Sequence, residues 1–147
     1  MYLMDRYNIT KFKAKHAQFI FSHGEREPNS LELDTKTLEC EDSWTGFYNG
    51  EPIVCGGIYP MWSSVAEVWI IMRQGSHTKH KFFMLRNIKK YLEETIQRKN
   101  YKRIQSTVRV DFEDGMKFAK WFGMESEGLM KQYGPDGKDY YRLARII

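Results

Sequence analysis

The stretch from Arg73 to Lys81 holds a dense group of side chains that could do chemistry. It reads Arg-Gln-Gly-Ser-His-Thr-Lys-His-Lys, so hydroxyl, imidazole and ammonium groups follow one another around a glycine. A helical pattern begins directly after it, and a helix start offers unpaired N–H donors and the positive end of a dipole. The stretch therefore predicts a site for an anion such as a phosphate group. The alternative is a basic helix start that faces water.

His77 and His80 have the His-x-x-His spacing that some metal sites use. Such a site needs further cysteine, histidine or carboxylate ligands, and no cysteine or acidic residue stands near this pair in the sequence. Lys79 lies between the two histidines and would repel a cation. We therefore expect no metal here.

Val65 to Met72 is nearly continuous in apolar residues, which predicts a central strand covered on both faces. Glu67 is the only carboxylate in this strand. It could act as a general base, or it could lie at the strand end in water. The sequence leaves both interpretations open.

The first half of the chain predicts a helix, a polar loop and a hairpin. Thr10 to Phe21 has helical apolar spacing, and Ser22 to Ser43 predicts a loop or a short second helix. Asn49-Gly50 is a strong hairpin signal, because both turn residues must accept a positive φ. It would join strands at Trp44 to Tyr48 and Pro52 to Tyr59. Small residues at Cys55-Gly56-Gly57 favour a β-bulge over a close backbone or ligand contact.

The second half predicts a long helix, a strand, a short helix and a closing hairpin. The long helix has Leu85, Ile88, Leu92 and Ile96 on one face, and Asn100 lies where a left-handed cap would end it. The later elements are a strand from Gln105 to Val110, a helix from Asp111 to Phe122 ended by Gly123, and two strands around Pro135-Asp136-Gly137. A strand, a helix and then a hairpin indicate an α/β domain with a mixed sheet.

Length and composition favour one packed domain over residues 1–147, because 41% of the residues are apolar and 15% are aromatic. No apolar run approaches the roughly 20 residues of a membrane helix. Cys55 lies in an apolar strand, where a reduced thiol is expected, so we expect an intracellular protein.

The net charge of +4 hides an acidic segment from Gly24 to Glu51 and a basic one from Met72 to Arg109. For the basic segment we favour a solvated helix face over nucleic-acid binding.

The order of these elements resembles the GCN5-related N-acetyltransferase (GNAT) superfamily over nearly the whole chain. The best local match is Phe118-Ala119-Lys120-Trp121-Phe122-Gly123-Met124, which resembles that family's F-A-x-x-x-G-F helix ending. The resemblance implies a GNAT-like (acyl-CoA N-acyltransferase) fold, an α/β single domain with a central mixed sheet of about six strands flanked by helices.

The same resemblance implies acetyl-CoA as cofactor and an unidentified amine as acceptor. The main chain of Trp69, Ile70, Ile71 and Met72 would hold the pantetheine where the central strand splays from its neighbour. The phosphates would meet the following loop, whose residues are Gln74, Gly75, Ser76, His77, Thr78, Lys79 and His80. The family loop reads Q/R-x-x-G-x-G/A, and this chain departs from it with His77 and Lys79 in place of small residues.

The catalytic residues do not transfer cleanly from the family. Many members use a tyrosine four residues before the helix glycine as the acid, and the matching residue here is Ala119. Tyr133 is our candidate substitute, with Tyr140 and Tyr141 as alternatives that could instead be packing residues. Glu67 is the candidate base. The leading function is therefore an acetyl-CoA-dependent N-acetyltransferase or acetyl-CoA binder.

The run from Val68-Trp69 to Leu85 also resembles small GNAT-like proteins of short-tailed phages, which include an internal virion protein family. That resemblance implies an alternative function, a catalytically silent protein for virion assembly or host-protein binding. The expected location is cytoplasmic, meaning the host cytoplasm or the virion for a phage protein. The expected acceptor is a small molecule or a protein, nucleic acid and membrane are not expected partners, and a homodimer stays open.

Overall fold

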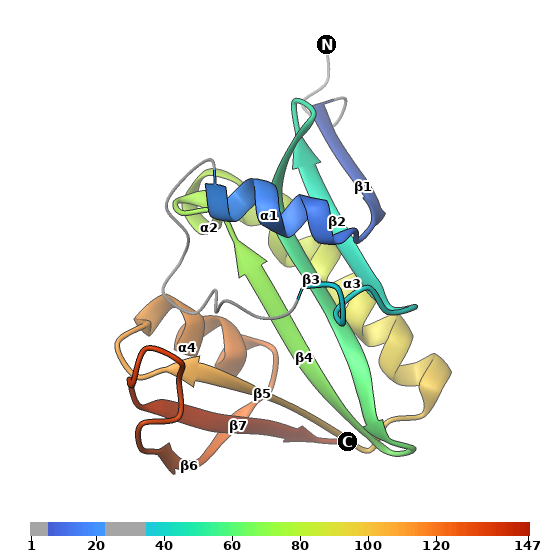
Figure 1. Cartoon of the computed structure of the whole chain (residues 1–147). Helices are drawn as coiled ribbons and strands as arrows, with labels where there is room; N and C mark the ends of the chain where they lie inside the picture. Colours follow the sequence, from blue (N-terminus) through green and yellow to red (C-terminus); the bar gives the residue numbers. More distant parts are fainter. Residues whose placement is uncertain (1–5, 23–34) are drawn as a thin grey trace.

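A computed structural model describes residues 6–22 and 35–147 of the chain. Its strands form one seven-stranded sheet in the order β1-β2-β3-β4-β5-β7-β6 (Figure 1). Only β4 and β5 are parallel, and the other neighbours are antiparallel, so the sheet is mixed as predicted. It has seven strands, not about six. The strands are β1 (Tyr7–Lys11), β2 (Ser43–Tyr48), β3 (Glu51–Trp62), β4 (Val65–Met72), β5 (Arg103–Arg109), β6 (Glu125–Met130) and β7 (Tyr140–Ile146).

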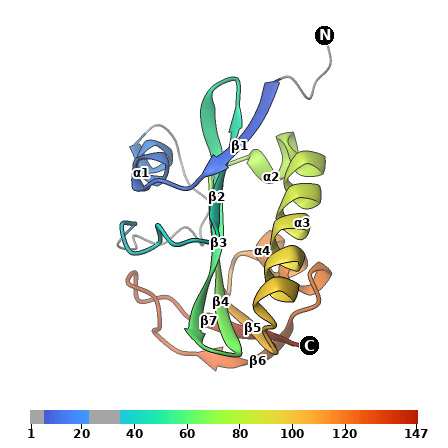
Figure 2. The ribbon, with the colours of Figure 1, turned by 90° about the vertical axis from the view of Figure 1, so that its right-hand side faces the viewer.

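Helices cover both faces of the sheet. Figure 2 shows α1 (Ala14–Ser22) on one face, with α3 (Lys81–Lys99) and α4 (Glu113–Trp121) on the other. A four-residue helix, α2 (Ser76–Lys79), leads into α3. Alternate residues of β4 serve the two faces: Trp69 and Ile71 pack with α1, while Ala66 and Val68 pack with α3 and α4. No helix in the described ranges has both the length and the apolar character needed to cross a bilayer.

The hairpin prediction at Asn49-Gly50 is confirmed. The two residues have φ angles of 50° and 81°, and they join β2 to β3. The predicted helix at Thr10 to Phe21 starts too early, because the chain is an edge strand through Lys11 and turns helical at Ala14. Of the predicted loop from Ser22 to Ser43, residues 23–34 lie outside the described part of the chain.

The β-bulge prediction at Cys55-Gly56-Gly57 is wrong. These residues pair without interruption with β2 and with β4, and the register shifts of β3 lie elsewhere. The small residues serve close packing instead. A Cβ on Gly57 would lie 2.8 Å from the Asp42 carbonyl oxygen and 2.9 Å from the indole nitrogen of Trp69.

The long helix follows the predicted pattern. Leu92 and Ile96 of α3 are buried against the sheet, and Ile88 packs beside them. Asn100 ends the helix in the left-handed conformation, with φ 57° and ψ 41°, and its N–H donates to carbonyls of the last turn. This cap was predicted from the residue type alone.

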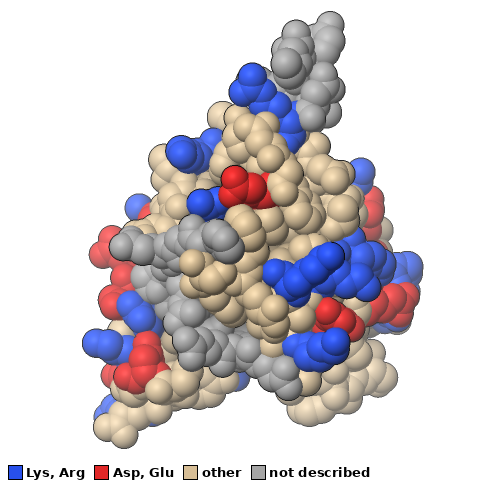
Figure 3. All heavy atoms as spheres, turned by 45° about the horizontal axis from the view of Figure 1, so that its top comes forward, with Lys and Arg blue, Asp and Glu red and all other residues tan. Residues whose placement is uncertain are grey.

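Some of the bases in the segment from Met72 to Arg109 are paired with acids that lie outside it. Figure 3 shows basic side chains in separate groups with acidic ones among them. Several arginines of the segment hold partners outside it: Arg73 pairs with Glu51, Arg98 with Asp42, Arg103 with Glu127, and Arg109 with Asp111 and Asp136. These arginines are therefore engaged by acids of the same chain.

The parting of β4 from β5 is the feature that shapes the site. The two strands pair at only three positions, Val65–Arg103, Ala66–Ile104 and Glu67–Gln105. Beyond Glu67 both strands continue without pairing to each other, and Figure 1 shows them diverging. The predicted splay of the central strand is therefore confirmed.

Candidate active site

A cavity of about 890 Å³ occupies the opening between β4 and β5. It is lined from both sides of the sheet, by residues packed with α1 and by residues of α3 and α4. The lining includes Leu38, Tyr59, Glu67, Trp69, Ile70, Ile71, Met72, His77, Thr78, Lys81, Leu85, Ser106, Val108, Asp114, Phe118, Ala119, Phe122, Met124 and Tyr133. Pockets for small-molecule ligands usually measure several hundred Å³. A ligand of that size could therefore extend through the sheet inside this cavity.

Glu67 lies at the inner end of the opening, at the last paired position of β4. Its carboxylate accepts a hydrogen bond of 2.9 Å from the Gln105 amide, and Nη1 of Arg142 donates to both oxygens at 3.1 and 3.2 Å. The Glu67 side chain is 15% exposed. The carboxylate is thus held in place and still reachable from the cavity.

Tyr59 stands directly opposite Glu67 in the β3–β4 ladder and lines the same cavity. Burial raises the pKa of Tyr59, and the neighbouring Glu67 charge raises it further. At neutral pH its hydroxyl is therefore a proton donor. The sequence did not reveal this residue, because a register shift between Pro60 and Trp62 moves Tyr59 opposite Glu67, where regular pairing from the turn would place Pro60.

Tyr133 lines the cavity from the loop between β6 and β7. Its ring is half exposed and meets the ring of Tyr140 edge-on at 5.6 Å. Tyr140 itself is fully buried, and burial raises the pKa of its hydroxyl to about 12. Neither Tyr140 nor Tyr141 lines the cavity, so among the three candidates Tyr133 alone does.

The outer part of the cavity runs along β4. Trp69, Ile70, Ile71 and Met72 all line it. One edge of this segment pairs with β3 through Met72, whereas the edge toward β5 has no strand partner beyond Glu67 among residues 6–22 and 35–147. Backbone groups on that edge can bind an extended ligand that carries amides, as strand addition does.

The predicted anion loop folds as a helical turn. Gly75 precedes it with φ 84°, and the N–H groups of Thr78 and Lys79 donate to the Gly75 carbonyl. The His80 N–H donates to Ser76. Of the seven residues proposed for this loop, His77 and Thr78 line the cavity, and the other five do not.

His80 points away from the cavity into an aromatic cluster. Its Nδ1 lies 2.8 Å from the Tyr7 hydroxyl, and its ring packs against Tyr48. Burial lowers the pKa of His80, and the charge of Lys79 lowers it further. This imidazole is therefore neutral at pH 7 and has a packing role.

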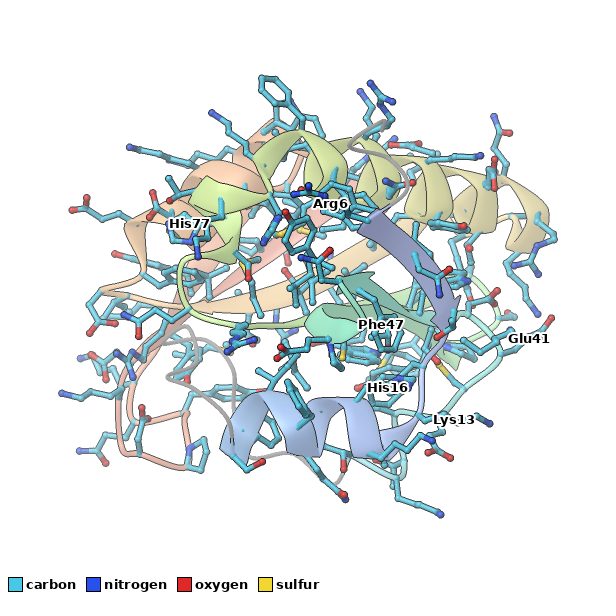
Figure 4. All side chains as sticks on the ribbon, turned by 90° about the horizontal axis from the view of Figure 1, so that it is seen from above. Arg6, Lys13, His16, Glu41, Phe47 and His77 are labelled. Carbon is cyan, nitrogen blue, oxygen red and sulfur yellow. The ribbon has the colours of Figure 1, made fainter. Side chains whose placement is uncertain are left out.

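The opening is bridged at its outer end by a polar contact between α2 and α4. Nε2 of His77, on α2, lies 3.0 Å from a carboxylate oxygen of Asp114, in the first turn of α4 (Figure 4 shows His77 on its helix). Lys81 begins α3 beside it. In the described hydrogen bonds the N–H groups of residues 81–83 have no acceptor, as expected for a first helical turn.

The described residues contain no group of three or more histidine, cysteine or acidic side chains arranged to hold an ion. Cys55 is completely buried, and burial raises the pKa of its thiol to about 12. The other buried histidine, His16, faces Phe47 at 5.0 Å between ring centres and is 2.7 Å from the Thr45 hydroxyl (Figure 4).

Comparison with solved structures finds close matches in fold. Ard1 from Thermoplasma volcanium superposes with a TM-score of 0.75 at 13% identity, covering 97% of this chain and 98% of that one. RimL, a ribosomal L7/L12 α-N-protein acetyltransferase in complex with coenzyme A, gives 0.69 at 16% identity, with coverages of 99% and 97%. The ribosomal-protein-S18-alanine N-acetyltransferase of Escherichia coli gives 0.67 at 14%, with coverages of 96% and 94%.

No protein-family model matches the sequence, and no curated protein sequence matches it either. At these identities the likeness to solved structures concerns the fold. The chain has the GNAT fold, with a mixed sheet between helical layers, as its element order predicted.

Proposed function

We propose that the protein is an acetyl-CoA-dependent N-acetyltransferase that acts on an amine acceptor. The observation that carries this proposal is the cavity between β4 and β5, which joins an unpaired strand edge to a held carboxylate. A thioester carrier could enter along the edge, and an amine could approach from the side of Glu67. The RimL structure, which contains coenzyme A, shares this fold and supports the choice of carrier.

The residues of the opening fit coenzyme A in chemical character. The edge of β4 that parts from β5 after Glu67 suits the amides of a pantetheine arm. The start of α3 offers N–H donors and the ammonium of Lys81, and His77 and Thr78 stand beside it. A helix start of this kind favours phosphate groups. Bound acetyl-CoA would supply the activated acetyl group.

Glu67 would take the proton that an ammonium acceptor must lose before it can attack. It lies at the inner end of the cavity, where Arg142 and Gln105 hold the carboxylate in one orientation. Tyr133 or Tyr59 would donate a proton to the departing thiolate. Both hydroxyl-bearing residues line the cavity, and they replace the helix tyrosine that is absent at Ala119.

Calorimetry with acetyl-CoA and with coenzyme A tests the carrier directly. We expect binding in the micromolar to low millimolar range, and release of free thiol when an amine acceptor is added. The absence of heat and of any thermal shift at millimolar acetyl-CoA would overturn the proposal. A loss of binding in Lys81→Glu, with unchanged binding in Lys90→Glu on the same helix, would locate the phosphates.

The α2 turn favours a second candidate function. In that case the chain is a catalytically silent GNAT-like protein that acts in virion assembly or in host-protein binding. In that turn the amides of Thr78, Lys79 and His80 already donate to carbonyls of the same segment. They are therefore less available to a diphosphate. In that case the protein would act in the host cytoplasm or in the virion.

Substitutions in the turn separate the two functions. Glycine permits a positive φ and a close approach of phosphate to the main chain. If the native protein binds no coenzyme A and the double variant His77→Gly, Lys79→Gly does, the silent function is supported. If the native protein binds coenzyme A and the double variant binds it more weakly, the transferase is supported.

A further inference from the structure

The cavity between β4 and β5 has two halves of different chemistry, one on each face of the sheet. Side chains alternate along a strand, and Trp69 and Ile71 pack on the face that carries α1. Glu67 therefore projects to that same face, and Tyr59, which packs beside the same cluster, lies there too. The proton transfers proposed above thus belong to the α1 half of the cavity.

The other half lies on the face that carries α3 and α4 (Figure 2). Six residues of the core cluster on that face also line the cavity, and all six are apolar. They are Val68, Leu92, Val108, Ala119, Phe122 and Met124. Each is buried, so the cavity reaches into the core at this place. We call the space between these six residues the apolar chamber.

The apolar chamber lies beside the inner end of the opening. Val68 directly follows Glu67, the last residue of β4 that pairs with β5. Ser106 is the first residue of β5 beyond that pairing, and its hydroxyl donates to the sulfur of Met124 at 3.3 Å. The Met124 N–H donates to the Ala119 carbonyl at 2.9 Å. A thioester that reaches Glu67 along β4 would therefore have its acyl carbons next to the chamber.

The chemistry of the chamber favours an apolar occupant. A buried water molecule needs two to four polar partners, and the six side chains offer it none. Ala119 contributes only a methyl group to the wall, so α4 leaves room there that a larger side chain would fill. An acetyl group brings one methyl group beyond its carbonyl, whereas a butanoyl group brings a chain of three carbons. Each methylene group taken out of water improves binding about threefold to fourfold.

We infer that the site transfers short straight-chain acyl groups longer than acetyl, such as butanoyl, with the chain held in the apolar chamber. This inference rests on the proposed function and names the class of its acyl donor. In the reaction the acyl carbon gains a bond to the amine nitrogen and loses its bond to sulfur. The ammonium nitrogen loses two protons. Glu67 takes one and passes it to water, and the departing thiolate takes the other, so the products are an amide and free coenzyme A.

Calorimetry with a series of thioesters tests the inference in the native protein without an acceptor. Coenzyme A, acetyl-CoA, propanoyl-CoA and butanoyl-CoA are titrated in turn. We expect butanoyl-CoA to bind about tenfold more tightly than acetyl-CoA, the gain from two buried methylene groups, with propanoyl-CoA between them. If butanoyl-CoA binds no more tightly than acetyl-CoA, the inference is overturned, because the pantetheine or the protein then fills the chamber.

Ala119→Val narrows the chamber by adding two carbons to its wall. The ratio of acetyl-CoA to butanoyl-CoA dissociation constants should fall from about ten to one or below. Ala14→Val is the matched control, since Ala14 is also a buried helical alanine but lies on α1 and does not line the cavity. It should keep the native ratio. A native ratio in folded Ala119→Val, with folding checked by thermal unfolding, would overturn the inference.

The series also separates this inference from the proposed function. If coenzyme A and acetyl-CoA bind but the longer chains bring no gain, the inference alone fails. If neither coenzyme A nor any thioester binds, the proposed function and the inference fail together. The comparison in the native protein decides between these outcomes even where a variant does not fold.

Discussion

Glu67 combines position and restraint, which are the two properties that a reacting carboxylate needs. It sits where the paired part of β4 ends, and two donors fix its oxygens. We predict that Glu67→Gln lowers kcat for acetyl transfer about 100-fold, because general base catalysis contributes on that order. The measurement is the rate of thiol release at saturating acetyl-CoA.

Glu127→Gln is the control for that prediction. Glu127 is also an acid held by an arginine, Arg103, but it lies on β6 and does not line the cavity. Its substitution should leave kcat within about twofold of the native value. A native rate in Glu67→Gln would remove Glu67 from the mechanism without affecting the coenzyme A site.

Two buried histidines should make stability depend on pH. Burial lowers the pKa of both His16 and His80 below their ordinary value of 6.5. Above pH 6.5 both are neutral in either state, so no stability is lost. As the pH falls below 6.5 the unfolded chain takes up these protons first, and the free energy of unfolding decreases. Urea denaturation at pH 7.0 and 5.5 should show this decrease.

The double variant His16→Gln, His80→Gln tests the assignment. It removes both titrating groups, so its free energy of unfolding should change less between these two pH values than that of the native protein. Glutamine can still accept a hydrogen bond from the Tyr7 or Thr45 hydroxyl. An equal decrease in the variant would assign the pH dependence to other groups.

Residue types in the sequence predicted part of the site. The central strand, Glu67 and the line from Trp69 to Met72 all face the cavity. The loop from Gln74 to His80 was harder to predict, because residue type does not say which side chains of a helical turn face the cavity. His77 lines the cavity, whereas the His80 ring contacts the Tyr7 hydroxyl. The contact of Arg142 with Glu67 could not be predicted, since it depends on the pairing of β7 with β5 and of β5 with β4.

At the scale of the secondary-structure elements, a single residue, Asn100, ends α3. Its left-handed conformation costs an ordinary residue about 1–2 kcal/mol. Asn100→Ala should therefore lower the free energy of unfolding by about 1 kcal/mol, measured by urea denaturation. Asn100→Gly should match the native protein or exceed it slightly, because glycine adopts this conformation without steric cost. Equal losses in both variants would point to a lost side-chain contact instead.

Elements with strong local signals were predicted best. The Asn49-Gly50 hairpin and β4 were found with bounds within a few residues or better, because turn chemistry and an unbroken apolar run are local properties. β1 was missed. Its five residues form an edge strand whose neighbour β2 lies more than thirty residues later, and Phe12 and His16 extend a helical spacing back toward it.

The folded molecule shields the Cys55 thiol from solvent and reagents. The reactivity of this thiol therefore measures global unfolding. The thiol has no exposed surface, and burial raises its pKa to about 12, so little thiolate exists at pH 8. We predict that iodoacetamide at pH 8 leaves Cys55 unmodified in the native protein, as read by peptide mass spectrometry. In 6 M guanidinium chloride both cysteines should react. Rapid native labelling of Cys55 would show that the sheet opens between β2 and β4.

Topology was predictable in outline and not in detail. The order of elements indicated a mixed sheet with helices on both faces, which the structure has. The insertion of β7 between β5 and β6 is a long-range choice that no local pattern encodes. The early separation of β4 and β5 also came from the family resemblance, because two unpaired strand edges look like any other strand in a sequence.

The separation of β4 from β5 gives the two edges of one strand different exchange behaviour. Amides of β4 that face β3 pair in a ladder up to Met72, whereas those beyond Glu67 that face the opening have no pairing strand in the described part of the chain. In deuterated solvent the second group should exchange orders of magnitude faster than the first in the empty protein. Any molecule that settles along that edge would slow them, so β4 itself would report its own occupancy, residue by residue, without a label or an assay for turnover.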